Sequence, residues 1–493
     1  MAAHDDAGSG ELAFATRRGR LVLLATVLAS GVAFLDGTVV IVALPRIGED
    51  LGADFSALQW VLDAYLLTLG SLVLAGGALG DVVGRRRVFL VGMWGFGVAS
   101  LLCAVAWSPT VLVGARALQG VFAALMTPAS LAILSASFAP EERGRAIGAW
   151  SGLAGVTTAV GPFLGGWLVD AASWRWVFLI NVPILAVTVL LTRAVVPADP
   201  GTAHGLSRRG IFHRVDLPGA SLTVVGLGLI VTPLIEAGRL PGAVVVGSVV
   251  AGVLTLAAFI VYERRRDQPM LPPGMFRIRT FSVANLVTLT VYAALTANSF
   301  LLSIALQRGL GYSALAAGAA TVPVTLVLLA FSARVGALLP RTGARPLLTL
   351  GALLAGAGLA LLAGINPDTS FLTGILPGVL VFAAGLVLIV APVTTTALTD
   401  VPPDRQGVAS GTNNAVARVG GLLAVAVLPL AAGLSTAEDP EPAALLEGVS
   451  VALWIAAMLC VVGAVTAWVG LRTRDCQGVP ARTPVPGQGG VAA

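Results

Sequence analysis

The stretch Gly77-Ala-Leu-Gly-Asp81-Val-Val-Gly84-Arg85-Arg86-Arg87 joins two long apolar runs of this chain. A weaker copy, Gly336-Ala-Leu-Leu-Pro340-Arg-Thr-Gly343-Ala-Arg345, returns 259 residues later, again between apolar runs. A short basic turn that recurs between apolar segments indicates an internally duplicated membrane protein. It does not indicate a soluble enzyme.

A second echo supports the duplication. Pro140-Glu-Glu-Arg-Gly144-Arg-Ala146-Ile-Gly148 matches Pro403-Asp-Arg-Gln-Gly407-Val-Ala409-Ser-Gly411 at an offset of 263 residues. The two echoes pair the second apolar run with the tenth and the fifth with the thirteenth. The chain therefore predicts two parallel six-span repeats separated by two inserted spans, a known transporter plan with its site at the interface of the repeats.

Composition predicts that most of the chain lies in a membrane. Of 493 residues, 57% are hydrophobic and 11% charged, and the mean hydropathy is +0.91, so polar groups are too few to cover a soluble surface. A run of about 20 apolar residues crosses a bilayer. The sequence contains fourteen such runs, roughly 20–44, 57–79, 87–106, 110–134, 146–170, 177–195, 216–236, 242–262, 282–306, 315–339, 346–365, 371–398, 406–433 and 448–471.

We therefore expect an all-α polytopic membrane protein with 14 transmembrane helices, arranged as two six-helix bundles with two inserted helices. The expected divisions are an N-terminal tail (1–19), the first bundle (20–195), a loop (196–215), the inserted helices (216–262), a second loop (263–281), the second bundle (282–471) and a disordered tail (472–493).

The arginines predict the orientation in the membrane. All 30 cationic residues are Arg, and with the N-terminus inside, 23 fall on the cytoplasmic side, four on the opposite side and three within spans. This imbalance follows the rule that cytoplasmic loops are basic, so both termini are expected in the cytoplasm of a bacterial cell, with the spans in its inner membrane. The net charge of +5 then reflects orientation and not nucleic-acid binding. The three cysteines and three histidines are scattered, so neither disulfides nor a metal site is expected.

Three ionisable residues share one depth in the first repeat. Asp36 lies about 12 Å from the outer end of its span, and Asp63 and Arg116 about 9 Å from theirs. Such groups are costly in a membrane unless they are paired or reached by water. We predict that Arg116 neighbours Asp36 and that proton gain at a carboxylate there is coupled to substrate release. A static buried ion pair is the alternative, and for Asp63 a second proton site, a cation site and a solvated rim carboxylate remain open.

Three further stretches complete the pattern set by the loop at 77–87. They are Leu35-Asp36-Gly37-Thr38-Val39-Val40-Ile41-Val42-Ala43-Leu44-Pro45, Arg116-Ala-Leu-Gln119-Gly120, and the glycines and proline at Gly148, Gly161, Pro162, Gly165 and Gly166. Together they resemble the major facilitator superfamily, and within it the fourteen-span drug:proton antiporters, over residues 17–472. The chain departs from the family pattern at Ile41, where Asn is usual, and at Thr157, where Gly is usual.

The resemblance implies a role for each motif. Gly77, Asp81, Gly84, Arg85 and Arg86 would form a conformational latch, in which Asp81 pairs with neighbouring arginines and the glycines allow a tight turn and close helix contact. The Arg116-Ala-Leu-Gln119-Gly120 stretch would take part in proton transfer, which agrees with the coupling role that depth suggests for Asp36, Asp63 and Arg116. The motif at Gly148, Gly161, Pro162, Gly165 and Gly166 is associated with exporters. A basic anchor and a merely kinked helix are the structural alternatives for the first and last motifs.

Candidate substrate contacts are polar or aromatic residues within spans. They are Trp60, Gln119, Tyr292, Asn298 and Arg418. A lone Tyr or Asn in a span is more often helix-packing glue, and Arg418 could pair within the second repeat, face the cavity or face an anion.

These features predict a proton-coupled antiporter that exports amphipathic drugs or antibiotics by alternating access. It would be a secondary active transporter and not an enzyme. It would need no cofactor, because the chain has no lysine for a nucleotide-binding loop and the proton gradient remains as the driving force. Its expected partners are protons, lipid and a small amphipathic substrate, without nucleic acid, and a monomer is expected. A proton symporter importing a small nutrient and a non-transporting membrane sensor are the rival functions. The role of the seventh and eighth spans stays open.

Overall fold

A computed structural model describes residues 12–197, 215–267, 269–402, 405–434 and 441–472. Within these residues fourteen helices are long and apolar enough to cross a membrane. The predicted all-α architecture and span count are thus confirmed. Most of the expected tails (1–19 and 472–493) and of the expected loop at 196–215 lies outside the described residues.

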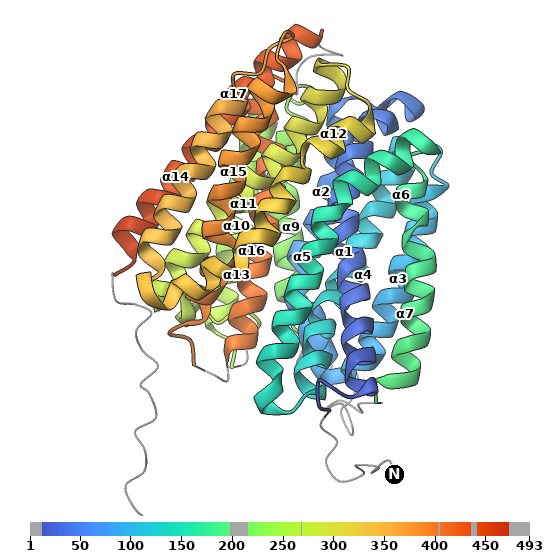
Figure 1. Ribbon diagram of the computed structural model, residues 1–493, viewed down its shortest axis with the longest axis vertical. Coiled ribbons are helices and arrows are strands. Elements are labelled where there is room, and N and C mark those ends of the chain that lie inside the picture. The colour runs from blue at the N-terminus through green and yellow to red at the C-terminus, as the bar shows by residue number, and fades with distance from the viewer. Residues whose placement is uncertain (1–11, 198–214, 268, 403–404, 435–440, 473–493) are drawn as a thin grey trace, which may run out of the picture.

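The first six spans form the N-terminal bundle, on the right in Figure 1. Side-chain caps begin three of its helices, because the oxygens of Thr16, Asp54 and Ser108 each accept a hydrogen bond from a first-turn backbone N–H. The bundle consists of α1 (Arg17–Leu51), α2 (Phe55–Val83), α3 (Arg85–Ala104), α4 (Pro109–Ser137), α5 (Pro140–Ala171) and one span made of α6 (Trp176–Leu179) and α7 (Asn181–Val195).

The last six spans form the C-terminal bundle, on the left in Figure 1. Two of its spans include a π-helical turn, and another is divided at Thr321 into α12 and α13. The bundle consists of α11 (Arg279–Ile304) with η2 (Ala305–Gly309), α12 (Ala314–Ala320) with α13 (Val322–Thr342), α14 (Ala344–Leu362), η3 (Phe371–Ile375) with α15 (Leu376–Leu398), α16 (Gln406–Ala431) and α17 (Pro442–Gly470). A short 3₁₀ helix, η1 (Pro273–Arg277), precedes it.

Of the two inserted helices, one lies against the line where the bundles meet and the other packs behind it. They are α9 (Leu217–Ile235) and α10 (Gly242–Arg264). α9 packs against α10, α2 and α16, and its end is tied to α2 because Trp60 Nε1 donates to Glu236 Oε1 at 3.0 Å and Ser56 Oγ donates to the Ile235 carbonyl at 3.2 Å. α9 therefore contacts one helix from each bundle.

The duplicated loop turns at a glycine with a positive φ in both halves. Gly84 separates α2 from α3 with a φ of 110°, and Gly343 separates α13 from α14 with a φ of 78°. A residue with a side chain rarely adopts such angles, so glycine permits each abrupt turn. The expectation for Gly77 was wrong in one respect: it lies inside α2, where an added Cβ would meet Pro128 at an ordinary 3.5 Å. The close helix contact is made by Gly76, whose Cβ would lie 2.1 Å from the Ala124 carbonyl oxygen.

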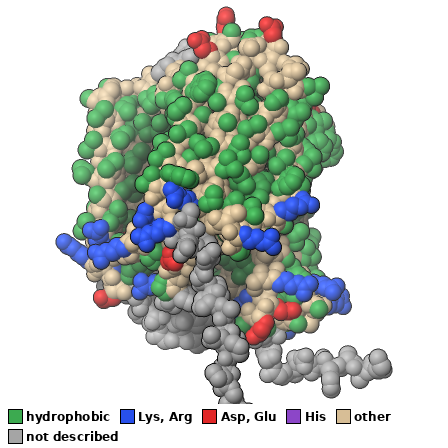
Figure 2. Space-filling view, turned by 60° about the vertical axis from the view of Figure 1, so that its left-hand side comes forward, with side chains coloured by type: hydrophobic (Ala, Val, Ile, Leu, Met, Phe, Trp, Pro, Cys, Tyr) green, Lys and Arg blue, Asp and Glu red, His purple; other side chains and the backbone are tan. Residues whose placement is uncertain are grey.

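The molecule has two ends, which we name from the helices. α1 begins at the terminal face, at the bottom of Figure 1, and α17 runs down toward the same face and ends on the left, about half-way up the picture. α1 ends and α2 begins at the opposite, far face. In Figure 2 the visible arginine side chains gather toward the terminal face, below a broad apolar surface. An apolar belt above a basic rim matches a protein embedded in a bilayer.

Candidate functional site

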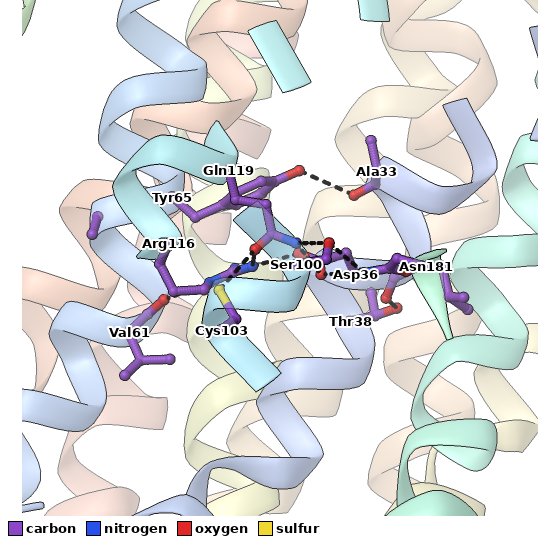
Figure 3. A network of polar contacts seen from close by, with 12 residues as sticks. Ala33, Asp36, Thr38, Val61, Tyr65, Ser100, Cys103, Arg116, Gln119 and Asn181 are labelled. Atoms are coloured by element: carbon purple, nitrogen blue, oxygen red, sulfur yellow. Dashed lines mark hydrogen bonds and ion pairs between the residues drawn. The ribbon is translucent and has the colours of Figure 1, made fainter. Parts of the chain in front are cut away.

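A fully buried ion pair joins α1 to α4 in the N-terminal bundle (Figure 3). Arg116 Nη1 lies 2.5 Å from Asp36 Oδ2, and both side chains are 0% exposed. Arg116 Nε also donates to the Val61 carbonyl of α2 at 3.0 Å. The structure thus brings together the two residues that the depth argument predicted to be neighbours.

Neutral polar side chains complete the surroundings of the Asp36 carboxylate. Gln119 Nε2 and Asn181 Nδ2 both donate to Asp36 Oδ1, at 2.9 and 3.0 Å. Gln119 Oε1 accepts from Arg116 Nη1 at 2.6 Å, and Gln119 Nε2 also donates to Ser100 Oγ at 2.9 Å. We call Asp36, Ser100, Arg116, Gln119 and Asn181 the Asp36 network. Gln119, expected at the substrate, is placed here instead, with both polar atoms engaged and its side chain buried.

Tyr65 of α2 packs against the Asp36 network. Its ring centre is 4.3 Å from the Arg116 guanidinium carbon, and its hydroxyl donates to the Ala33 carbonyl at 3.1 Å. A desolvated cation on an aromatic face is worth about 2 kcal/mol. The Arg116 charge is therefore balanced by a carboxylate on one side and a π face on another.

Asp63 is buried without a partner. Its side chain is 0% exposed, and neither carboxyl oxygen has a hydrogen-bond partner among the described residues. It shares a face of α2 with Gln59, whose Nε2 donates to the Val425 carbonyl of α16 at 2.5 Å, and with Gly70, which packs on Arg418 of α16. Asp63 therefore faces the contact between the bundles, and in this conformation it is not a solvated rim carboxylate.

Glycines of the exporter motif make close contact between the bundles toward the far face. A Cβ on Gly166 would lie 2.3 Å from the Ala314 carbonyl oxygen, and a Cβ on Gly318 would lie 2.1 Å from the Pro162 carbonyl oxygen. Next to them Asp170 accepts hydrogen bonds from the backbone N–H of Ala314 and of Leu315, at 3.2 and 2.8 Å. α5 and α12 are thus held together backbone to backbone.

Helices α1 and α11 extend this closure across the far face. Ser303 Oγ donates to the Ile41 carbonyl at 3.2 Å, and Gln307 Nε2 donates to the Val42 carbonyl at 3.0 Å. The rings of Phe55 and Phe300 meet edge to face, with centroids 5.7 Å apart. The far face is therefore sealed by polar and aromatic contacts between the bundles.

The same face of α5 is free nearer the terminal face. Gly148, Gly152 and Gly155 continue the spacing of three and four residues that leads to Pro162 and Gly166, so all five lie on one side of the helix. A Cβ on Gly148, Gly152 or Gly155 would meet no atom within 4 Å. The bundles are thus joined at the far face and separated along α5 toward the terminal face, and the interior opens to the terminal face.

The predicted latch residues lie at the terminal face. Asp81 Oδ1 pairs with Arg85 Nη2 at 3.0 Å, and Arg86 Nη2 donates to the Arg193 carbonyl of α7 at 2.9 Å. The Asp81 side chain is 62% exposed, so this pair contributes little to stability by itself. Pairing of Asp81 with a neighbouring arginine agrees with the expectation.

The remaining candidate substrate contacts are dispersed. Trp60 faces α9, whereas Asn298 is buried in α11 with its Oδ1 lacking a described partner. Tyr292 and Arg418 are partly exposed, and the Arg418 guanidinium carbon lies 5.6 Å from the ring centre of Phe34 in α1. Arg418 and Phe34 thus meet across the bundle interface, while Trp60 packs where α9 and α16 come together beside α2.

Asn181, Ser100 and Asp170 are positioning residues that sequence reasoning missed. Asn181 stands at the start of a span, Ser100 is one of many small polar residues in helices, and Asp170 lies near the end of a span, where a carboxylate is ordinarily at the membrane interface. The sequence offers one signal for Asp170. It is a carboxylate close to the end of its span, and the helix that it contacts, α12, begins after Ser313, a typical N-cap residue.

Two six-helix bundles that meet along one interface, with a charged network buried at membrane depth, are the plan of a membrane transporter. The chain belongs to the Major Facilitator Superfamily, whose family model matches residues 26–425.

Several characterised proteins are similar along most of their length. The puromycin resistance protein pur8 of Streptomyces alboniger is 39% identical over 92% of this chain and 91% of its own. The cephamycin export protein CmcT of Amycolatopsis lactamdurans is 38% identical over 84% and 86%, and the tetracenomycin C resistance and export protein of Streptomyces glaucescens is 33% identical over 82% and 74%. A crystal structure of a POT family transporter in complex with 5-aminolevulinic acid superposes with a TM-score of 0.69 over 93% of this chain and 97% of that one, at 15% identity. That likeness concerns the fold alone.

Proposed function

We propose that this protein is a secondary active transporter that exports amphipathic drugs or antibiotics from a bacterial cell in exchange for protons. Relatives that cover most of the chain are named as antibiotic resistance and export proteins, and the glycine-rich face of α5 matches the exporter motif. The observation that carries proton exchange is the Asp36–Arg116 pair, buried completely at membrane depth.

The arginine-rich terminal face is assigned to the cytoplasm, with both termini inside, since basic loops stay on that side. The conformation described above is then closed to the outside and open to the cytoplasm. An exporter loads its substrate in this state, so the structure corresponds to the loading step.

Protonation of Asp36 conflicts with the observed network. A proton on Asp36 removes the negative charge that balances Arg116, and an uncompensated buried charge costs about 3–5 kcal/mol. The protonated carboxyl and the intact network therefore belong to different conformations. Such a difference couples proton binding to the movement of the bundles, because a ligand shifts an equilibrium only through its unequal affinity for the two states.

Asp63 supplies the second part of the coupling. Closure of the far face presses α2 against α16 and removes water from Asp63, whose oxygens then have no partner. An unpaired carboxylate in such surroundings costs several kcal/mol, and a proton taken from the outside removes that charge. Return to the cytoplasm-open state thus carries a proton inward.

The proposal is tested in a pump-deficient bacterial host and in proteoliposomes. The protein should raise resistance to a subset of a panel of antibiotics, and a protonophore should abolish that resistance. In proteoliposomes an effective compound should move protons that an internal pH dye detects. Asp36→Asn and Asp63→Asn should each abolish this proton movement, whereas Asp368→Asn, in an exposed loop at the far face, should leave it intact.

Two results would contradict the proposal. Full proton-coupled efflux by Asp36→Asn would remove the role of the Asp36 network. Proton-dependent accumulation of the same compounds, in place of efflux, would identify a symporter.

A further inference from the structure

We propose that Arg418 binds the acidic group of the substrate, so that this transporter prefers amphipathic anions with a carboxylate, sulfonate or similar group on an aromatic framework. The inference rests on the proposed function and narrows its substrate class. It begins with a cation at the bundle interface that no carboxylate balances.

Arg418 extends from the C-terminal bundle onto the N-terminal bundle. A Cβ built on Gly70 of α2 would lie 3.2 Å from the Cβ of Arg418, so α2 and α16 touch at this level. The guanidinium carbon lies 5.6 Å from the ring centre of Phe34 in α1. One cation is thus shared by helices from both bundles.

No anion of the described chain neutralises this cation. The structure shows neither an ion pair nor a hydrogen bond of the Arg418 side chain within the described ranges. The Arg116 side chain, by contrast, donates three hydrogen bonds. Asp36 is already paired with Arg116. Asp63 lies on the same face of α2 as Gly70 but seven residues away, about 10 Å along the helix, and both of its oxygens lack a partner.

An unbalanced arginine within a membrane helix is costly unless it pairs or is reached by water. Arg418 is partly exposed in the conformation that opens to the terminal face, so a molecule entering from that face can reach it. With the Asp36–Arg116 pair neutral as a unit and Asp63 protonated as in the proposed proton cycle, the interface carries one net positive charge. That charge favours an anionic substrate and disfavours a cationic one.

Aromatic side chains beside Arg418 suit the remainder of such a substrate. The ring of Phe34 packs edge to face on Trp150 of α5, with centroids 6.5 Å apart, and Phe34, Trp150 and Tyr292 are each partly exposed. Flat apolar walls around a few placed polar groups are the usual make-up of small-molecule sites. An aromatic body would pack on these rings while its acidic group meets the guanidinium.

The site also lies next to the proton-coupling residues. Phe34, on which Arg418 packs, is two positions from Asp36 on α1, and Tyr65 lies against Arg116. An anion bound at Arg418 therefore changes the electrostatic field at the Asp36 network. The inside-negative membrane potential additionally favours the exit of an anion.

The test compares two dyes that share one aromatic framework. 8-Anilinonaphthalene-1-sulfonate carries a permanently ionised sulfonate, and N-phenyl-1-naphthylamine lacks it. Binding of each is measured by equilibrium dialysis on the full-length protein in nanodiscs, with empty nanodiscs subtracted and no proton gradient applied. The wild type should bind the sulfonate at least about tenfold more tightly than the neutral dye, a ratio equivalent to about 1.4 kcal/mol.

Three variants assign the preference to Arg418. Arg418→Gln should remove the tenfold preference while leaving affinity for the neutral dye unchanged, and Arg418→Lys should retain part of it. Arg345→Gln is the matched control, because Arg345 also stacks on an aromatic ring, that of Trp468 at 3.9 Å, but between α14 and α17 within the C-terminal bundle. This control should keep the full preference.

Equal affinity of the wild type for both dyes would overturn the inference. So would an Arg418→Gln variant that keeps the preference, or one that weakens both dyes equally and so shows a purely structural arginine. Since the binding assay uses no gradient, it succeeds or fails independently of proton coupling. Loss of coupling with an intact sulfonate preference would overturn only the proposed function.

Discussion

Substitution of Gly166 by Ala should open the far face. The added Cβ would lie 2.3 Å from the Ala314 carbonyl oxygen and 2.7 Å from Leu315 Cα, both backbone atoms that cannot rotate away. Overpacking of this kind costs about 1–3 kcal/mol. The cost applies only while α5 and α12 touch, so it shifts the equilibrium about 5- to 150-fold toward the conformation in which they are apart.

The shift can be measured as cysteine accessibility. Ser303→Cys, in a background with Cys103, Cys460 and Cys476 replaced by Ala, introduces a thiol that far-face closure buries, since Ser303 is 7% exposed and bonded to α1. Its rate of modification by a maleimide follows the far-face-open population. Adding Gly166→Ala should raise that rate about 5- to 150-fold.

Two further glycines make this prediction refutable. Gly318→Ala overlaps the Pro162 carbonyl from the opposite side of the same contact and should have the same effect, whereas Gly148→Ala meets nothing within 4 Å and should have none. Unchanged labelling with both Gly166→Ala and Gly318→Ala would show that the contact between α5 and α12 does not hold the far face closed.

Other substitutions test the remaining contacts. Gly155→Leu occupies space that is empty here, so it should preserve thermal stability and substrate binding yet abolish efflux by blocking closure of the terminal face; efflux at the wild-type rate would refute this. Arg116→Gln leaves Asp36 as a buried unpaired charge and should destabilise the protein by about 3–5 kcal/mol, most of which the double variant with Asp36→Asn should restore in a thermal-unfolding cycle. Asp170→Ala removes the acceptor for two N–H groups of α12 and should raise Ser303→Cys labelling less than Gly166→Ala does; an unchanged rate would contradict it.

The parts of the fold that repeat or follow a period could be predicted from the sequence. Apolar runs marked all fourteen spans, because lipid requires continuous apolar helices. The adjacency of Asp36 and Arg116 followed from their shared depth, because pairing two opposite charges at one level of a bilayer lowers the free-energy cost of burying both. The importance of Gly84 and Gly343 followed from the repeated loop, because both copies have a glycine at this place.

Features set by the rotation of one helix against another could not be predicted. Depth places Asp63 at the right level, but only packing shows that it faces α16 without a partner. The same holds for Asn181, which donates to Asp36 from α7, and for Ser100 of α3, which accepts a hydrogen bond from Asn181. The glycine that contacts α4 closely is Gly76 and not Gly77, because adjacent positions on a helix differ by about 100° in direction.

The inserted helix α9 makes the two flanks of the transporter unequal. Along α2 and α16 the join between the bundles is covered by α9, with α10 behind it. Within the described chain, the join beside α5 has no such cover, and its glycine face is open toward the terminal face. On the α5 flank the join near the terminal face accordingly meets the surrounding lipid directly, whereas α9 stands between the join and the lipid on the other flank. The two inserted helices thus leave the join between the bundles in direct contact with lipid on one flank only.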